Sequence, residues 1–484
     1  MPCLAKDRID ANGKRSLQGP SATKAAYWKA LRSVYLPFVL VATIMMTSAS
    51  AARATSYTVN ATDDTSGAGN CSLRDAINAA NGTPTSTSTC TTPGTGTDTI
   101  QFSVTGTITL NSALPVIANT SPGSLTIDGS GQAITLDGAT EYQIFSVNSG
   151  ATLKLQFLTL FHGSVTDGEG GAIINQGTLT VTNSTFSANQ AAGGGGGHHG
   201  DGDGGAISNQ GTLTVTNSTF SANQANGGSG GPDSNGDGGA IFNANASTLT
   251  VTNSTFSANQ AAGDTGGFGD KGDGGAIFNA GTLTVTNNTF SANKVDPGSG
   301  GGGVNGEGGA IFNESSGTVE LKGTILAAST PTPGNCGGSA VTDAGYNISD
   351  DATCNFVSGS GSSVITLPSV IGLDPFGLQN NGGPTQTIAL LAGSPAIDAI
   401  PLASCTLTTD QRGMPRPDAG EGVCDIGAYE FQESFAGTSG TTNCQGKSVS
   451  ALSQQYGSLA AAANALGFPS VKALQAAIKA FCAG

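Results

Sequence analysis

The sequence predicts an all-β fold, a right-handed parallel β-helix (a solenoid), and two features of the chain carry this prediction. The tetrapeptide Gly-Gly-Ala-Ile occurs five times, at intervals of 34, 34, 36 and 34 residues. Each of the first four copies is followed by the same run, Thr-Leu-Thr-Val-Thr-Asn-x-Thr-Phe-Ser-Ala-Asn. A fixed period of this length indicates one structural unit stacked on itself. The copies begin at Gly170, Gly204, Gly238, Gly274 and Gly308.

Residues 1–54 have the pattern of an export signal. Lys24, Lys29 and Arg32 precede an apolar run at 34–46, and small residues follow it. This pattern predicts a signal peptide that is cleaved near Ala51 or Ala54. Residues 1–54 hold eight basic and two acidic residues, so their removal changes the formal net charge from −15 to −21. A field of that sign disfavours nucleic acid and anionic lipid as partners.

An N-terminal cap at residues 55–99 is expected to contain one short helix. Ser72 and Asp75 form a capping box that opens a helix over 73–80, and Asn81-Gly82 closes it. A solenoid exposes unpaired backbone groups at its ends, so it needs such a cap. The strand-and-turn units that follow indicate that the coils begin near residue 100.

Each repeat is expected to form one coil of three short strands. In residues 178–182 apolar and hydroxyl side chains alternate, which is typical of a strand with one buried face. Residues 170–174 and 185–188 are expected to form the other two strands. A Gly-rich segment of constant length, such as 190–203, then leads to the next repeat, and we expect it to be a loop that carries binding residues.

Coils stacked about 4.8 Å apart would align equivalent residues in columns. We expect an inner phenylalanine stack, two asparagine ladders that hydrogen-bond the turns, and an outward threonine array. The phenylalanines are Phe186, Phe220, Phe256 and Phe290. The first ladder contains Asn175, Asn209, Asn243, Asn279 and Asn313, and the second Asn189, Asn223, Asn259 and Asn293. The array comprises residues 178/180/182, 212/214/216, 248/250/252 and 282/284/286.

Eight cysteines follow the signal segment, and they fall into four sequential pairs outside the repeats. Their order favours the pairings 71–90, 336–354, 405–424 and 444–482, although spacing leaves the other pairings open. Disulfides agree with export to an oxidising compartment. The last pair brackets an Ala-rich stretch with helical spacing that is interrupted at 467–470, which predicts a short, disulfide-clipped helical hairpin.

Three segments of the chain resemble known families. Cys71-Ser-Leu-Arg-Asp-Ala-Ile resembles the CSLREA-type motif of many bacterial secreted β-helix proteins. Gly-Gly-Ala-Ile paired with Phe-x-x-Asn resembles the repeats of the polymorphic outer-membrane proteins, which are adhesin-like. Residues 335–431 resemble the choice-of-anchor Q domain through runs such as Asp410-Gln-Arg-Gly and Asp425-Ile-Gly-Ala-Tyr-Glu. The resemblance implies secretion or display at a cell surface and does not imply a known reaction. For such a protein we expect an extracellular polysaccharide or the surface of a host or neighbouring cell as partner.

An acidic residue precedes every Gly-Gly pair of the repeats, so stacking would place five carboxylates in one column. Like charges at such spacing repel, which raises their pKa values or recruits a cation. Calcium is the metal that this oxygen donor set would take, with Asp201, Asn235 and Asp270 as further ligands. The alternative is a solvated acidic edge. The candidate calcium column comprises Glu169, Asp203, Asp237, Asp273 and Glu307.

No residue is assigned a catalytic or cofactor-binding role. Parallel β-helices often host polysaccharide lyases and hydrolases, which need a basic residue beside calcium or paired carboxylates in a groove. Residues 100–330 contain no Arg, and Asp128 and Asp137 have the setting of ordinary turn residues. His162 is expected to be structural, and the pair His198-His199 has no further ligand in register.

The sequence therefore predicts an exported, non-catalytic β-helix protein that is adhesin-like or binds glycan through its Gly-rich loops. The alternatives are a carbohydrate-active β-helix enzyme and an ice-binding or purely structural solenoid. No membrane-spanning segment is expected after signal removal. The expected parts are a signal peptide (1–54), an N-terminal cap (55–99), the coils (100–330), a choice-of-anchor Q-like cap (331–432), a linker (433–443) and a helical pair (444–484).

Overall fold

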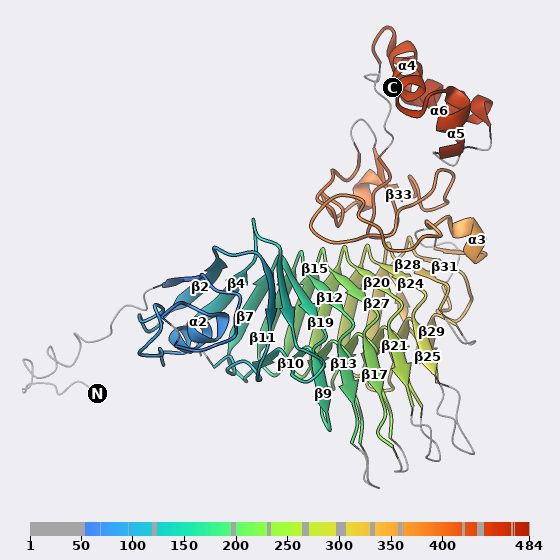
Figure 1. Ribbon diagram of the computed structural model, residues 1–484. Coiled ribbons are helices and arrows are strands. Elements are labelled where there is room, and N and C mark those ends of the chain that lie inside the picture. The colour runs from blue at the N-terminus through green and yellow to red at the C-terminus, as the bar shows by residue number, and fades with distance from the viewer. Residues whose placement is uncertain are drawn as a thin grey trace, which may run out of the picture. The chain divides into compact units, whose positions relative to one another are not determined.

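A computed structural model describes the chain from residue 54 to residue 483 with several short gaps. The described residues are 54–67, 69–94, 96–118, 123–194, 200–229, 234–263, 271–296, 306–329, 334–356, 361, 363–418, 422–432, 440–465, 468 and 470–483. Most of their strands pair in parallel in four stacked sheets, and this confirms the parallel β-helix (Figure 1).

Sheets A and B each contain ten strands. Sheet A comprises β1 (Ser56–Val59), β2 (Thr97–Phe102), β4 (Ser124–Asp128), β7 (Thr152–Gln156), β11 (Thr178–Thr182), β15 (Thr212–Thr216), β19 (Thr248–Thr252), β23 (Thr282–Thr286), β27 (Thr318–Lys322) and β30 (Thr342–Asp343). Sheet B comprises β3 (Gly106–Thr109), β5 (Ile134–Asp137), β8 (Leu158–Phe161), β12 (Thr185–Ser187), β16 (Thr219–Ser221), β20 (Thr255–Ser257), β24 (Thr289–Ser291), β28 (Ile325–Ala327), β31 (Ile348–Ser349) and β32 (Val364–Ile365).

Sheets C and D are shorter. Sheet C comprises β6 (Phe145–Val147), β10 (Ile173–Asn175), β14 (Ile207–Asn209), β18 (Ile241–Asn243), β22 (Ile277–Asn279), β26 (Ile311–Asn313) and β29 (Cys336–Gly338). Sheet D comprises β9 (Ser164–Thr166), β13 (Gln190–Ala192), β17 (Gln224–Asn226), β21 (Gln260–Ala262) and β25 (Lys294–Asp296). The expectation of three strands per coil was wrong, because sheet D adds a fourth strand at the start of each Gly-rich segment.

The inner columns follow the expected register. Rings of the Phe186–Phe290 column stack with centroids 4.7, 4.9 and 4.8 Å apart, and all four side chains are fully buried. In the asparagine ladders Asn175 Nδ2 donates to Asn209 Oδ1 at 2.7 Å, and Asn189 Nδ2 donates to Asn223 Oδ1 at 2.9 Å. The outward threonines of sheet A also pair residue by residue. Aligned repeats thus supply both the apolar core and the hydrogen bonds of the buried turns.

The N-terminal cap contains α2 (Leu73–Ala80), with the bounds that its sequence predicted. Ser72 Oγ accepts the Asp75 N–H at 3.2 Å, as a helix N-cap does. The Asp75 carboxylate instead accepts hydrogen bonds from Ser66 Oγ and the Gly67 N–H. Because β1 pairs with β2, sheet A extends further toward the N-terminus than the expected start near residue 100.

Residues 366–432, which we call the lid, fold back onto the outer face of sheet B. The lid contains α3 (Pro368–Ile371), a 3-10 turn at Leu402–Ser404, and the antiparallel pair β33 (Ile400–Pro401) and β34 (Val423–Cys424). Its apolar residues, including Ile371, Leu390 and Ile426, pack with Ile325 and Ile348 of sheet B. The lid therefore has a small core of its own that is shared with the last coils.

All four sequential disulfides are present: Cys71–Cys90, Cys336–Cys354, Cys405–Cys424 and Cys444–Cys482. The last one closes a tail of three helices, α4 (Cys444–Tyr456), α5 (Leu459–Ala465) and α6 (Val471–Ala483), where a helical pair was expected. The extra break occurs at Gly457, whose φ of 78° ends α4 in the left-handed region. In the described parts of the chain, no helix has the length and apolar character to span a membrane.

Candidate functional site

The three aspartates of the predicted calcium column form a hydrogen-bonded ladder. Asp203 Oδ1 accepts the Asp237 N–H at 3.3 Å, and Asp237 Oδ1 accepts the Asp273 N–H at 2.9 Å. Asp273 Oδ1 accepts the Glu307 N–H at 2.8 Å. One oxygen of each carboxylate is thus occupied by the backbone of the next coil. The column therefore has a structural role and concentrates carboxyl groups along one line of the β-helix.

The two glutamates of the predicted column do not share this arrangement. Glu169 Oε2 accepts hydrogen bonds from Ser208 Oγ at 2.7 Å and from Gln210 Nε2 at 2.8 Å. Glu307 Oε2 accepts the Gly338 N–H at 3.0 Å. Each glutamate therefore bonds to the sheet C strand of the next coil or to the residue that follows that strand.

Burial sets the charge state of the aspartate ladder. The side chains of Asp203, Asp237 and Asp273 are 8%, 9% and 1% exposed. Desolvation, and then the charge of the neighbouring carboxylate, raises the pKa of Asp203 and Asp237 well above the usual range. Desolvation also raises the pKa of Asp273, although Lys271 Nζ lies 2.7 Å from its Oδ2 and opposes that shift.

Calcium in this column stays a prediction. Within the described residues, no group of three or more His, Cys, Asp or Glu side chains is arranged to hold a metal ion. Of the further ligands, Asp201 Oδ1 accepts the Asn235 N–H and Asn235 Oδ1 accepts the Lys271 N–H, which makes a second ladder beside the first. Asp270 and the His198-His199 pair lie outside the described residues.

Replacing Asp203 and Asp237 together by asparagine is expected to raise the melting temperature at pH 8 without calcium. Each carboxyl pKa is higher in the folded state than in the unfolded state. The folded protein therefore holds protons that the unfolded chain releases, and its stability falls as the pH rises above about 4. Asparagine removes this loss and keeps an oxygen for the backbone bond. Thermal unfolding of both proteins at pH 5 and pH 8 measures the effect.

The same measurement with millimolar calcium tests the metal prediction. A bound cation favours ionised carboxylates, so calcium would raise the melting temperature of the wild type most at pH 8. The double variant would then show no calcium response. A wild-type melting temperature that calcium leaves unchanged at pH 8 would contradict the prediction.

A second feature, which sequence reasoning did not single out, is a column of seven threonines on the outer face of sheet B. Strand pairing aligns them residue by residue across seven coils. The column comprises Thr107, Thr135, Thr159, Thr185, Thr219, Thr255 and Thr289. The lid covers the last three, which are 1%, 0% and 1% exposed, and leaves the first four uncovered.

Polar groups of the lid bond to the covered threonines. Thr219 Oγ1 donates to the Gln386 carbonyl at 2.6 Å, and Thr255 Oγ1 donates to Gln411 Oε1 at 2.6 Å. Thr289 Oγ1 accepts the Ala428 N–H at 3.1 Å. The column thus offers hydroxyls that act as both donors and acceptors toward a polar chain laid across it.

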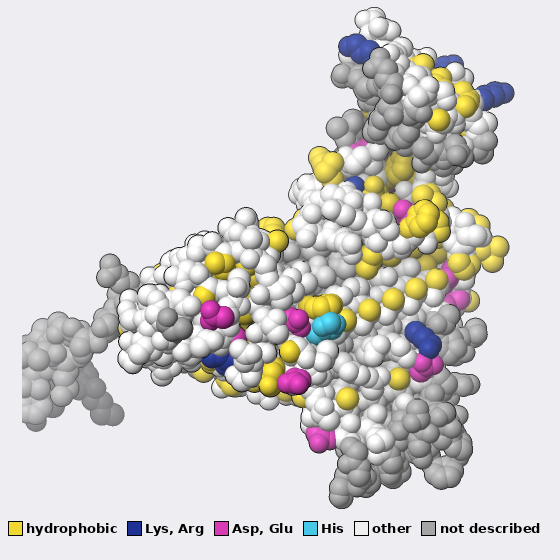
Figure 2. Space-filling view, in the orientation of Figure 1, with side chains coloured by type: hydrophobic (Ala, Val, Ile, Leu, Met, Phe, Trp, Pro, Cys, Tyr) yellow, Lys and Arg dark blue, Asp and Glu magenta, His cyan; other side chains and the backbone are white. Residues whose placement is uncertain are grey.

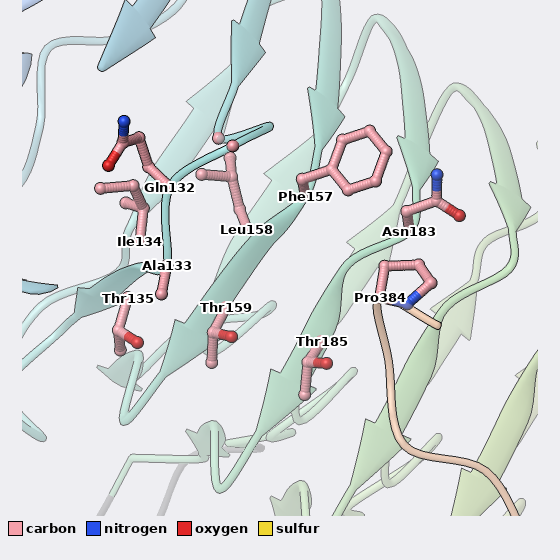
Figure 3. A pocket seen from close by; sticks show the side chains of 12 residues that line it. Gln132, Ala133, Ile134, Thr135, Phe157, Leu158, Thr159, Asn183, Thr185 and Pro384 are labelled. Atoms are coloured by element: carbon pink, nitrogen blue, oxygen red, sulfur yellow. The ribbon is translucent and has the colours of Figure 1, made fainter. Parts of the chain in front are cut away.

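The uncovered threonines line an open groove that ends at the lid. Two adjoining hollows of about 310 and 550 Å³ share Thr135, Thr159, Thr185 and Pro384. Figure 3 shows the three threonines in a row on successive strands, with Pro384 of the lid beside Asn183 and Thr185. We call this hollow, with Thr107 at its far end, the threonine groove.

The flanks of the threonine groove are aromatic and polar. Phe157 and Asn183 lie on one side, and Phe161, Asp137 and Ser187 lie on the other. Asp137 is the one charged residue among those that line the two hollows. The visible surface of the coils is likewise mostly neutral, with isolated charged side chains (Figure 2). A neutral, hydroxyl-rich ligand fits this lining better than a charged one.

The residues weighed for catalysis have structural contacts. Asp128 Oδ1 accepts the Ser130 N–H and Asp137 Oδ1 accepts the Ala139 N–H, as expected for turn residues. His162 Nδ1 lies 3.6 Å from Asp137 Oδ1, and its ring packs on Phe161. These contacts account for the three side chains without assigning them a reaction.

No protein-family model matches the chain, and no curated protein sequence matches it significantly. Among solved structures, the crystal structure of Jun a 1, the major allergen from cedar pollen, is similar over 65% of this chain and 80% of the allergen chain. The sequence identity is 16% and the TM-score is 0.32.

Proposed function

We propose that the protein is an exported, non-catalytic β-helix that binds a neutral extracellular polysaccharide in the threonine groove. The groove is the observation that carries this proposal, because the same threonine column already binds polar groups of the lid on the neighbouring coils. Export is supported by the signal-like segment at 1–54 and by four disulfides, which form in oxidising compartments. The family resemblances point to the same setting.

The geometry suits an extended chain of sugar rings. Coils repeat about every 4.8 Å along the column, so consecutive rings of a polysaccharide meet equivalent hydroxyls. Phe157 and Phe161 are half-buried, so part of each ring is exposed and can contact the apolar side of a pyranose. The sequence predicted that the Gly-rich loops bind the ligand, and the tips of these loops lie outside the described residues. The threonine groove is a second surface that we propose for the same function.

Replacing Thr135 and Thr159 together by arginine is expected to weaken binding to a neutral glucan at least about tenfold, equivalent to about 1.4 kcal/mol. Both side chains face outward, so the bulky charges fill the groove without entering the core. Thr214→Arg on sheet A is the matched control, because Thr214 is also an outward, half-buried strand residue. Affinity electrophoresis of residues 55–484 in gels containing neutral or uronate-rich polysaccharides measures the effect.

The outcomes separate the competing functions. Equal retardation of the groove variant and the control, or no retardation in any gel, would contradict groove binding. New reducing or unsaturated ends in the polysaccharide, with or without calcium, would instead support a carbohydrate-active enzyme. Thermal hysteresis or ice shaping that depends on Thr214 would support the ice-binding alternative.

A further inference from the structure

Among the described residues, the buried Asp98 carboxylate has no cationic partner. Asp98 lies on β2 and is 1% exposed. Its Oδ1 accepts the backbone N–H of Thr55 at 2.9 Å, the Thr55 side chain also hydrogen-bonds the carboxyl group, and Oδ2 has no hydrogen-bond partner among the described residues. No Lys or Arg among the described residues forms an ion pair with Asp98. A carboxylate in this state is costly, because desolvation is not repaid.

The backbone nitrogen of Thr55, which donates to Asp98, lies next to a predicted signal cleavage site. Ala52-Arg53-Ala54 has the small-x-small pattern that precedes a signal cleavage point, and Thr55 follows it directly. The Thr55 carbonyl accepts the Thr99 N–H at 2.9 Å, so Thr55 is held at the edge of sheet A from both of its backbone ends. Sequence patterning allows cleavage after Ala51 equally well.

We infer that the export signal is removed at the Ala54–Thr55 bond and that Asp98 binds the α-ammonium group that this cleavage creates. Hydrolysis by a signal peptidase adds water across the amide, leaving a carboxylate on Ala54 and an ammonium group on Thr55. That nitrogen is already 2.9 Å from Asp98 Oδ1, so cleavage places a positive charge beside the Asp98 carboxylate. Its additional donors can satisfy Oδ2. Cleavage after Ala51 would leave an uncharged amide at this position.

The surroundings favour this ion pair. A hollow of about 210 Å³ beside Thr55 is lined by Tyr57, Cys71 and residues 89–92. Tyr57 donates its hydroxyl to the Thr92 carbonyl, and burial followed by the Asp98 charge raises its pKa to about 12, so it stays neutral. On the adjacent α2, Arg74 pairs with Asp64, and Asp75 is bound by Ser66 and Gly67. The α-ammonium group is thus the cation best placed to neutralise Asp98.

The position of cleavage is tested on the full chain exported from a bacterial host. Intact-mass measurement and N-terminal sequencing of the exported protein should give a chain that starts at Thr55. A start at Ala52 would overturn the inference and leave export standing. An uncleaved chain retained inside the cell would overturn both the inference and the proposed export, so the two failures are distinguishable.

The ammonium site is tested on purified proteins that start at Thr55 or at Ala52, each made both with Asp98 intact and with the substitution D98N. The Thr55 form should melt higher than the Ala52 form, and D98N should abolish the difference. An ammonium pKa raised by a partner gives stability that is present at neutral pH and lost above its folded value, so the difference should vanish at strongly alkaline pH. NMR titration of the ¹³C-methylated α-amine should show at least about tenfold higher proton affinity in the wild type than in D98N, against a usual pKa of about 7.7–8.0. Equal titration in both proteins would overturn the assignment even if D98N is less stable.

Discussion

Replacing Phe256 by alanine is expected to destabilise the coils by about 3–5 kcal/mol, the usual cost of removing a buried aromatic side chain. The Phe256 ring is fully buried and stacks on Phe220 at 4.9 Å and on Phe290 at 4.8 Å. Its removal leaves a cavity in the middle of a column and cuts the contact between the coils on either side. Because each coil depends on its neighbours, the loss falls on the interfaces that hold the stack together. Chemical denaturation followed by circular dichroism measures it.

Thr250→Ala in the neighbouring β19 is the control for this variant. Thr250 faces outward from sheet A, so its loss is expected to change stability by less than about 0.5 kcal/mol. A Phe256→Ala protein as stable as the control would mean that the column can collapse around the cavity. The inner stack would then not be the main source of cohesion between coils.

The parts of the fold that sequence predicted best are those that repeat. A period of 34 residues forces equivalent residues into register, so Phe256, Asn259 and the outward threonines could be placed without a structure. Sheet D was missed because only three residues of each Gly-rich segment, such as 190–192, enter it. A strand of three residues with a single buried side chain, such as Ala191, gives little of the alternation that marks a strand.

The threonine groove could not be predicted, because its boundary depends on contacts between distant parts of the chain. Gln411 donates to Thr219 Oγ1 across 192 residues of sequence. No local sequence pattern predicts the contact between Gln411 and Thr219, and the motif around Asp410 was identified only through its resemblance to a known domain.

The aspartate ladder is an intermediate case. Its alignment followed from the period, whereas the bond from each carboxylate to the next backbone N–H needed the geometry of the turn.

Replacing Arg416 by methionine is expected to cost the lid about 3–5 kcal/mol, the usual cost of leaving a buried charge unpaired. Arg416 is 3% exposed, and its Nε lies 2.9 Å from Glu430 Oε2. Desolvation already raises the pKa of Glu430 to about 7, against the opposing effect of Arg416. Without the guanidinium, Glu430 must take up a proton or leave its site. Either change loosens the segment that carries Ala428 and its bond to Thr289.

Hydrogen exchange read out residue by residue distinguishes a detached lid from an unfolded protein. In Arg416→Met the N–H groups of Gln411 and Ala428, which bond within the lid and to sheet B, should lose protection. The N–H groups of β19 should keep it, because the Phe256 column does not depend on the lid. Lys154→Met, which removes an exposed cation from β7, is the control and should leave both sets unchanged. Protection of the lid equal to that of the wild type would show that Arg416 does not hold it.

If protection is lost, Thr219, Thr255 and Thr289 become accessible, and the groove lengthens from four threonines to seven. The same variant would then bind a long neutral glucan more tightly than a short one, which ties the stability of the lid to the length of ligand that the coils accept.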